Sequence, residues 1–341
     1  TAKRKAEVRA RAESGETGVL IGTQALIQKS SVVKNAGLVI VDEQHRFGVA
    51  QRAALAEKGA APHILAMSAT PIPRTLALIV YGDLEVSVLN EMPRGRLPVK
   101  TYAVDSTFRQ RVYNFIKKHI AAGRQAYIVC PLVENSEGKS EKASAIEYYN
   151  GLVNGDFRDI PTGLLYGKLK QSEKDRVMAE FKSGSLKLLV STTVIEVGID
   201  VPNAVVMLIE NAEQFGLSQL HQLRGRVGRG SEQSFCILMS DSRSEYTKAR
   251  TDVMVRTTDG FEIAREDLRL RGPGNFFGRE QHGLPPLKVA DIADDSVVLE
   301  EVDRLAGEIL RADPTLSDEK SRMLRSNVER LFGTNGDYGW N

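Results

Sequence analysis

The sequence is 341 residues long, enough for two or three domains with sizeable hydrophobic cores. Hydrophobic residues make up 42% and charged residues 26% of the chain, as in ordinary globular proteins, and no run of about 18 apolar residues predicts a membrane span. The net charge is only +2, so any binding of nucleic acid must come from local basic patches. Cys130 and Cys236 lie in apolar runs, which predicts buried thiols, no disulfide framework and a cytoplasmic protein.

Short apolar runs alternate with amphipathic helical patterns, which predicts parallel α/β sheets. In the first part of the chain, we expect strands covered by helices on both faces over residues 18–22, 38–41 and 63–67. Residues 93–98 are rich in proline, glycine and arginine and predict a linker. Residues 1–92 are therefore predicted to form a first domain.

Residues 99–257 are predicted to form a second α/β domain. A helical pattern over residues 106–120 is expected to end at Gly123, and Ser172 and Asp175 resemble a capping box that opens a helix reaching Phe181. A further helix is expected over about residues 141–152, and strands over residues 126–132, 164–166, 186–191, 205–209 and 235–239. Residues 258–341 form a third region, in which Asp313-Pro314 separates two helical stripes.

The most informative stretch runs from Gln222 to Arg229 and reads Q-x-R-G-R-x-G-R. Arg226 and Arg229 are three residues apart, so on a helical turn their guanidinium groups share a face and can bind phosphate oxygens. The glycines allow a positive φ or a close approach of the backbone to a ligand. A basic, solvated helix end is the alternative, but the spacing favours arginines that act on a transferring γ-phosphate.

Asp42 and Glu43 directly follow the apolar run over residues 38–41. At the carboxyl end of a strand, Asp42 could hold Mg²⁺ through water, and Glu43 could orient and deprotonate an attacking water. By itself this pair is better explained as an acidic turn. Ser68 and Thr70 follow the next apolar run, where their hydroxyl groups could link the nucleotide state to a neighbouring lobe, although this signal is weak alone.

A strand-like run over residues 189–191 leads into hydroxyl groups, then a glycine, an acid and a proline. Thr192 and Thr193 could contact a DNA phosphate, and Gly198 and Asp200 could face the ribose or the triphosphate. A plain strand and turn explains each of these pieces separately, but it explains all of the motifs in this order much less well.

Taken in order, these stretches resemble motifs II, III, V and VI of the superfamily 2 helicases. The match is most specific to the RecG family of bacterial branched-DNA helicases, over DEQHRFGV (42–49), SATPIPRT (68–75), ENAEQFGLSQLHQLRGRVGRG (210–230) and the segment 259–283. The resemblance covers essentially the whole chain. The transcription-repair coupling factor Mfd shares SATPIPRT but typically reads DEEQ where this chain has DEQH, so RecG is the better match.

The resemblance implies two RecA-like parallel-sheet lobes, the first one truncated, followed by a helical hairpin translocation motif and C-terminal helices. It implies ATP and Mg²⁺ as cofactors. The implied catalytic residues are Asp42, Glu43, Gln222, Arg226 and Arg229. The residues implied to bind ATP or couple its state are His45, Ser68, Thr70, Gly198 and Asp200. The residues implied to contact DNA or serve translocation are Thr192, Thr193, Arg269, Arg271 and Gln281.

By the same resemblance, the protein is an ATP-dependent helicase or translocase that reverses replication forks and migrates Holliday junctions in recombination and repair. Its implied partner is branched double-stranded DNA, with no membrane, and it is expected to be a monomer. An Mfd-like translocase is the first alternative. A DNA-binding or regulatory protein without catalysis is the second.

Two departures from the family pattern bear on activity. No G-x-x-x-x-G-K-[ST] phosphate loop occurs in the sequence, because Gly138-Lys139-Ser140 has Val133 where the first glycine belongs. The chain, which starts at Thr1 in helix-like sequence, is therefore expected to be a C-terminal piece that lacks the wedge domain and the phosphate loop and is inactive by itself. In addition, Arg279-Glu280 stands where RecG proteins often have Thr-Arg, which leaves the contact of that family arginine open here.

Overall fold

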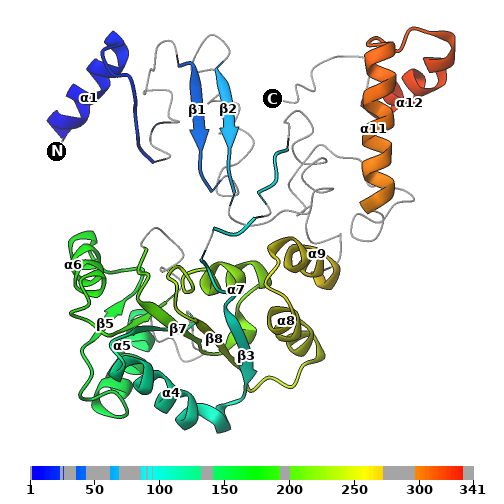
Figure 1. The fold of residues 1–341 in the computed structure, drawn as a ribbon. Helices are drawn as coiled ribbons and strands as arrows, with labels where there is room; N and C mark the ends of the chain where they lie inside the picture. Colours follow the sequence, from blue (N-terminus) through cyan, green and yellow to red (C-terminus); the bar gives the residue numbers. More distant parts are fainter. Residues whose placement is uncertain are drawn as a thin grey trace. The chain divides into compact units, whose positions relative to one another are not determined.

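A computed structural model describes residues 2–23, 26, 36–43, 62–68, 86–89, 91–93, 95–131, 141–192, 200–271 and 296–332. The chain divides into two compact units, residues 72–301 and residues 1–71 together with 302–341 (Figure 1). Within the described residues, the larger unit contains a six-stranded sheet and the smaller unit a two-stranded sheet.

The sheet of the larger unit is parallel throughout, with strand order β3-β8-β7-β4-β6-β5. Its strands are β3 (Lys100–Val104), β4 (Gln125–Val129), β5 (Thr162–Leu165), β6 (Leu188–Ser191), β7 (Ala204–Ile209) and β8 (Phe235–Met239). Strands β4, β6 and β7 are buried along their whole length, as expected for strands covered on both faces. The apolar runs predict all of these strands except β3, a half-exposed edge strand whose polar residues hide it in the sequence.

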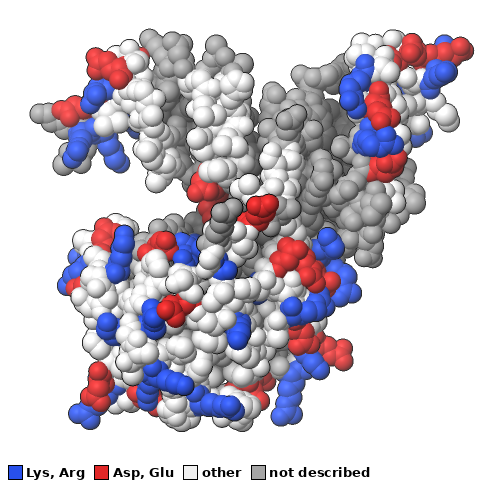
Figure 2. Space-filling view, viewed as in Figure 1, with Lys and Arg blue, Asp and Glu red and all other residues white. Residues whose placement is uncertain are grey.

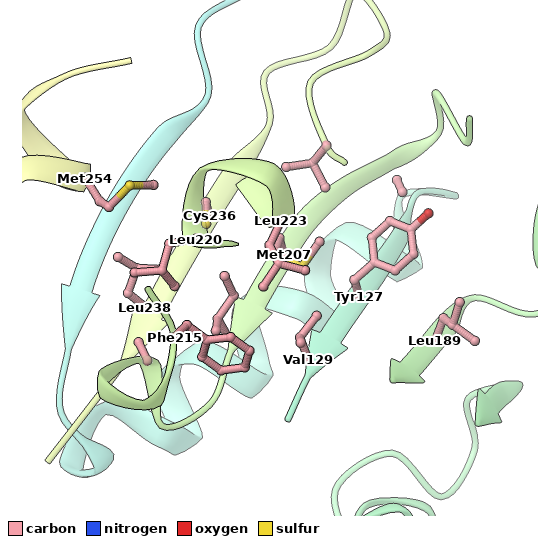
Figure 3. Close-up of a cluster of buried hydrophobic side chains, with 14 of the residues drawn as sticks. Tyr127, Val129, Leu189, Met207, Phe215, Leu220, Leu223, Cys236, Leu238 and Met254 are labelled. Atoms are coloured by element: carbon pink, nitrogen blue, oxygen red, sulfur yellow. The ribbon is translucent and has the colours of Figure 1, made fainter. Parts of the chain in front are cut away.

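Helices cover both faces of this sheet (Figure 1). They are α4 (Arg109–Ala121), α5 (Glu141–Asn154), α6 (Gln171–Lys182), α7 (Leu217–Arg224) and α8 (Glu245–Arg256), while α9 (Gly260–Arg271) packs on α7 and α8. One core packs Val112 and Ile116 of α4 against the sheet. The other packs Leu220 and Leu223 of α7 against Tyr127, Met207 and Cys236 (Figure 3). Both cysteines are buried and free, as the sequence predicts.

The starts and ends of two helices test the local sequence signals. A 3-10 turn (Ser106–Phe108) leads into α4, and Gly123 follows its end with a φ of +82°, which confirms the predicted helix and its stop. Helix α6 begins at Gln171, so the capping box predicted from Ser172 to Asp175 is wrong. The backbone N–H of Lys170, still extended, instead donates to Glu173 Oε2 at 3.3 Å.

The smaller unit begins with α1 (Ala2–Ser14) and contains strands β1 (Leu38–Val41) and β2 (His63–Ala66), which pair in parallel. Both predicted strands are confirmed, but the prediction that helices cover them on both faces is wrong, because Leu38 is 58%, Ile40 57% and Leu65 48% exposed. Residues 18–22 form no strand, contrary to the prediction. Ile21 is 90% exposed, and an apolar run forms a strand only where a neighbouring strand completes its hydrogen bonds.

The C-terminal region contains α11 (Ser296–Ala312), a 3-10 turn (Glu319–Ser321) and α12 (Arg322–Phe332). Asp313 ends α11 as predicted, and its carboxylate accepts backbone hydrogen bonds from Ser317 and Asp318, both at 2.9 Å. Among the described helices of the chain, none is long and apolar enough to span a membrane.

Candidate functional site

The Q-x-R-G-R-x-G-R stretch forms the last turn of α7 and the turn that follows it, which we call the arginine turn (residues 225–229). Because α7 connects the parallel neighbours β7 and β8, this turn lies at the edge of the sheet where those strands begin. Arg229 places Nη1 3.5 Å from Asp200 Oδ1, and its Nε donates to the carbonyl of Gly225 at 3.1 Å. Arg229 is therefore oriented by the protein yet 26% exposed, so it can meet a ligand.

Glycine is required at one position of the arginine turn. Gly228 has a φ of +76°, and a Cβ there would lie 2.6 Å from Val99 Cγ2. The predicted need for glycine is thus met at Gly228. Gly225 has an ordinary φ of −66° and only caps α7.

The three arginines of the stretch differ in their burial. Arg226 and Arg229 are half-buried, as is Gln222. Arg224 is only 3% exposed, and its Nη1 donates to the carbonyls of Met254 at 2.9 Å and Thr257 at 2.8 Å. Arg224 therefore binds the protein itself, and Arg226 and Arg229 remain as candidates to bind phosphate.

Two ionisable groups report the electrostatics around the arginine turn. Burial raises the pKa of Tyr127 to about 12, and the positive charges of Arg226 and Arg229 partly oppose this shift. Burial lowers the pKa of His221 to about 4, with Arg224 adding to the decrease. His221 is therefore neutral at physiological pH, and the positive charge of the turn comes from arginine alone.

In the smaller unit, the predicted acidic pair and Ser68 lie at the same edge of the two-stranded sheet. Asp42 and Glu43 follow β1, and Ser68 follows its parallel neighbour β2. Glu43 has a φ of +52°, an uncommon backbone conformation for a residue other than glycine, and its N–H donates to Asp42 Oδ1 at 2.9 Å. His45 and Thr70 lie outside the described residues.

The oxygen donors of this pair fit Mg²⁺, which is commonly held by one or two carboxylates while waters and substrate phosphates complete its coordination. Asp42 is exposed and offers such a carboxylate. No group of three or more metal-ligating side chains occurs among the described residues, so a fully protein-bound metal is not built there.

The structure separates the predicted residues of the 192–200 segment. Asp200 precedes β7 and joins Arg229, whereas Thr192 follows β6 at the opposite edge of the sheet. Thr192 is 1% exposed, and its N–H donates to the carbonyl of Leu165 at 3.1 Å. In this position Thr192 does not reach the surface, so a contact with DNA would require local movement. Thr193 and Gly198 lie outside the described residues.

Helix α9 carries the described part of the predicted translocation motif. It packs against α7 and α8, with Ile263 and Leu268 buried, and Ser218 Oγ of α7 donates to Asp267 Oδ2 at 3.3 Å. Arg269 is exposed and pairs with Glu266 at 2.9 Å. Arg271 is the last residue of α9, and Gln281 lies outside the described residues.

Basic residues in the loop after β5 are candidates for binding phosphate that lie outside the helicase motifs of the sequence. Lys168 and Lys170 are exposed there, and Lys174 Nζ donates to the carbonyl of Gly167 at 2.6 Å, which orders the loop. Their only sequence signal is the short K-x-K pattern after a predicted strand. On the face of the larger unit shown in Figure 2, basic and acidic side chains are interspersed, in keeping with the low net charge.

Comparisons with known proteins agree with this arrangement. Three family models match: DEAD/DEAH box helicase over residues 1–79, the helicase conserved C-terminal domain over residues 109–231, and ATP-dependent DNA helicase RecG, domain 3, C-terminal, over residues 257–339. The chain is 49% identical over 326 residues to the ATP-dependent DNA helicase RecG of Bacillus subtilis, covering 96% of this chain and 48% of that protein. It is 52% identical over 300 residues to RecG of Thermotoga maritima, covering 88% and 38%.

A solved structure of RecG bound to a three-way DNA junction also matches, with a TM-score of 0.65 and 48% identity over 88% of this chain and 38% of that chain. The parallel sheets and these matches place the chain among the superfamily 2 helicases, which have RecA-like domains. Within that class, the chain belongs to the RecG family of ATP-dependent DNA helicases, which confirms the resemblance and does not favour Mfd. It spans 48% of the Bacillus and 38% of the Thermotoga relative.

Proposed function

We propose that the complete protein is an ATP-dependent helicase or translocase that reverses replication forks and migrates Holliday junctions, and that this chain supplies part of its motor. The observation that carries the proposal is the arginine turn, in which Asp200 orients a half-exposed Arg229 at the edge of a RecA-like sheet. The identity of about half of all residues to RecG proteins supports the same function.

In this proposal, Arg226 and Arg229 bind the phosphates of ATP and stabilise the charge that develops on the γ-phosphate during transfer, while Gln222 contacts the same phosphates. Asp42 holds Mg²⁺ through water, and Glu43 orients and deprotonates the attacking water. Bound Mg²⁺ supplies neutralising charge to the phosphate oxygens. The residues proposed to bind ATP, or to link its state to the neighbouring lobe, are Ser68, Asp200, His45, Thr70 and Gly198.

DNA is proposed to bind through its backbone, because phosphate contacts fix position without reading sequence. Lys168 and Lys170 are exposed candidates of the larger unit. Thr192, after local movement, and Thr193 are further candidates. Arg269, Arg271 and Gln281 are proposed to couple hydrolysis to movement on DNA, since α9 packs directly on the helix that precedes the arginine turn. The protein is proposed to act as a monomer in the cytoplasm, in keeping with its two free cysteines.

Replacement of the arginines in the complete protein tests the proposal. We expect Arg226→Ala and Arg229→Ala each to lower ATP hydrolysis in the presence of forked DNA by a factor of about 10² to 10³. Arg325→Ala is the matched control, because Arg325 is an exposed arginine of α12 that pairs with Glu329 of its own helix. Hydrolysis that stays at the wild-type rate in both arginine-turn variants would reject the assignment.

A further inference from the structure

The segment that carries Asp200 and the segment that carries Arg229 touch at the edge of the sheet where β7 and β8 begin. Gly230 lies so close to Pro202 that a Cβ added at Gly230 would be 2.8 Å from the carbonyl oxygen of Pro202. Arg229 directly precedes Gly230, and Asp200 lies just before Pro202 in the sequence. The place of one segment against the other therefore decides how Asp200 meets Arg229.

Asn203 fixes the first of these segments to the start of β4. Its Nδ2 donates to the carbonyl of Gly123 at 3.0 Å and to Gln125 Oε1 at 3.2 Å, and its backbone carbonyl accepts from the N–H of Gln125 at 3.0 Å. Gln125 is 2% exposed, and its own Nε2 donates to the carbonyls of Phe181 at 2.6 Å and Leu186 at 2.8 Å. A buried amide whose oxygen and nitrogen are both hydrogen-bonded holds its partners in one arrangement.

Arg124 joins the two segments directly. Its Nη1 donates to Asn203 Oδ1 at 3.3 Å, and its Nη2 donates to Glu232 Oε1 at 2.8 Å. Asn203 follows Asp200 and Glu232 follows Arg229 at the same spacing in the sequence, so one planar guanidinium group spans both segments. Arg124 is 35% and Glu232 53% exposed, so their ion pair contributes little to stability. Asn203 is therefore the stronger anchor of the two.

Apolar packing alone does not fix the direction in which Asp200 points. Val201, the next residue, is 2% exposed and belongs to the core that α7 packs on. Apolar contacts are non-directional, so they hold the segment against the sheet without setting its orientation. Hydrogen bonds weaken steeply when their geometry is distorted, and those of Asn203 therefore supply the orientation that Val201 does not.

We propose that Asn203 is a positioning residue that, together with Arg124, fixes Asp200 at its place beside Arg229. The proposal rests on the proposed function, in which Arg229 acts on the γ-phosphate of ATP. Asn203 touches neither ATP nor DNA in this role, because its Oδ1 and Nδ2 both form hydrogen bonds within the protein. It acts on hydrolysis only through Asp200 and Arg229.

Asn203→Ala in the complete protein is the direct test, because it removes the side-chain hydrogen bonds to Gly123, Arg124 and Gln125. We expect kcat for DNA-dependent ATP hydrolysis to fall about tenfold, since a displaced Arg229 no longer meets the charge of the transition state. The KM for ATP should change less than about twofold, because that charge has not developed when ATP binds.

Arg229→Ala supplies the background that separates positioning from folding. Asn203→Ala should lower kcat about tenfold in the wild type but less than about twofold in Arg229→Ala, because an absent guanidinium group cannot be misplaced. Arg124→Met gives the same comparison in a variant that keeps the bonds between Asn203 and Gln125. It should lower kcat about threefold in the wild type and leave kcat unchanged in Arg229→Ala.

Tyr149→Phe is the matched control. Tyr149 Oη donates to the carbonyl of Thr162 at 3.0 Å, so this variant removes a part-buried hydrogen bond of the same unit between α5 and β5. It should lower the melting temperature and leave kcat unchanged in both backgrounds. A wild-type kcat in Asn203→Ala, or a loss of equal size in both backgrounds, would overturn the positioning role alone. A wild-type rate in Arg229→Ala would refute the proposed function and the positioning role with it.

Discussion

At the scale of single residues, Gly228 sets the shape of the turn that carries Arg226 and Arg229. Gly228→Ala should destabilise the larger unit by about 2 kcal/mol, because the new Cβ combines a strained positive φ with a clash. The contact responsible is the 2.6 Å approach to Val99 Cγ2. Urea unfolding followed by a signal from the larger unit measures the change.

Gly225→Ala is the control for this substitution. Its φ is −66°, and the atom nearest to an added methyl group, the carbonyl oxygen of Gln222, would be 3.4 Å away. Alanine should therefore cost less than about 1 kcal/mol there. Equal losses at the two positions would show that the turn does not specifically require glycine at position 228.

His221 makes the stability of the larger unit depend on pH. Its pKa is lowered to about 4 by burial first and by Arg224 second, whereas the nearby Asp259 acts in the opposite direction. The unfolded chain, with a histidine pKa near 6.5, binds the proton more tightly, so this contribution to stability is complete above pH 6.5 and is lost as the pH falls toward 4. His221→Gln should remove this part of the pH dependence. Unfolding midpoints of both proteins between pH 7 and about pH 4 test it, and parallel curves would refute it.

The arginines show what a sequence can and cannot decide at this scale. Spacing singles out Gln222 to Arg229 as a unit, and the structure adds that Arg229 Nη1 lies 3.5 Å from Asp200 Oδ1. Spacing cannot separate Arg224 from its neighbours, because its burial depends on where α8 ends, some 30 residues later. The burial of Thr192 likewise depends on residues distant in the sequence, so the sequence pattern alone does not predict it.

At the scale of elements, Glu210, which follows β7, forms a partly buried ion pair with α4 and accepts a tyrosine hydrogen bond from α5. Arg109 Nη1 lies 2.5 Å from Glu210 Oε1, and Tyr148 Oη donates to the same oxygen at 2.9 Å. Glu210 is 4% exposed and Arg109 36% exposed. Arg109→Ala would leave a buried carboxylate without its cation, which should destabilise the larger unit by about 2 kcal/mol, less than for a fully buried pair.

The double variant Arg109→Ala/Glu210→Gln separates the lost charge pair from lost packing. Because a neutral amide needs no cation, the double variant should be more stable than Arg109→Ala alone by about 1 kcal/mol in its free energy of unfolding. Thermal unfolding of the wild type, both single variants and the double variant completes the cycle. No recovery in the double variant would mean that packing, not charge, accounts for the loss.

Elements buried on both faces could be predicted from the sequence, and those that depend on a partner could not. Strands β4, β6 and β7 consist mainly of apolar residues, and their fold follows from that pattern alone. The edge strand β3 is partly polar, so only its pairing with β8 reveals it. The apolar residues 18–22 predict a strand but form none, and in the described part of the chain no strand pairs with them.

At the scale of the whole molecule, the 341 residues contain no G-x-x-x-x-G-K-[ST] phosphate loop. In the proposed mechanism, Arg226 and Arg229 can stabilise a transition state only if other groups hold the triphosphate in place. The 341-residue chain alone should therefore show no hydrolysis of ATP that depends on DNA. Phosphate release at saturating ATP and fork DNA measures this, and release that Glu43→Gln abolishes would contradict it.

The most direct test of the proposed function is fork unwinding by the complete protein with and without Glu43→Gln. This substitution removes the carboxylate proposed to deprotonate water but keeps the size of the side chain. ATP hydrolysis and fork reversal should therefore both fall by a factor of about 10² or more. Binding of the fork itself should remain. We predict that the wild-type protein reverses a fork with ATP. We predict that the variant binds the fork but neither hydrolyses ATP nor reverses the fork. Fork reversal by the variant at the wild-type rate would contradict the proposed function.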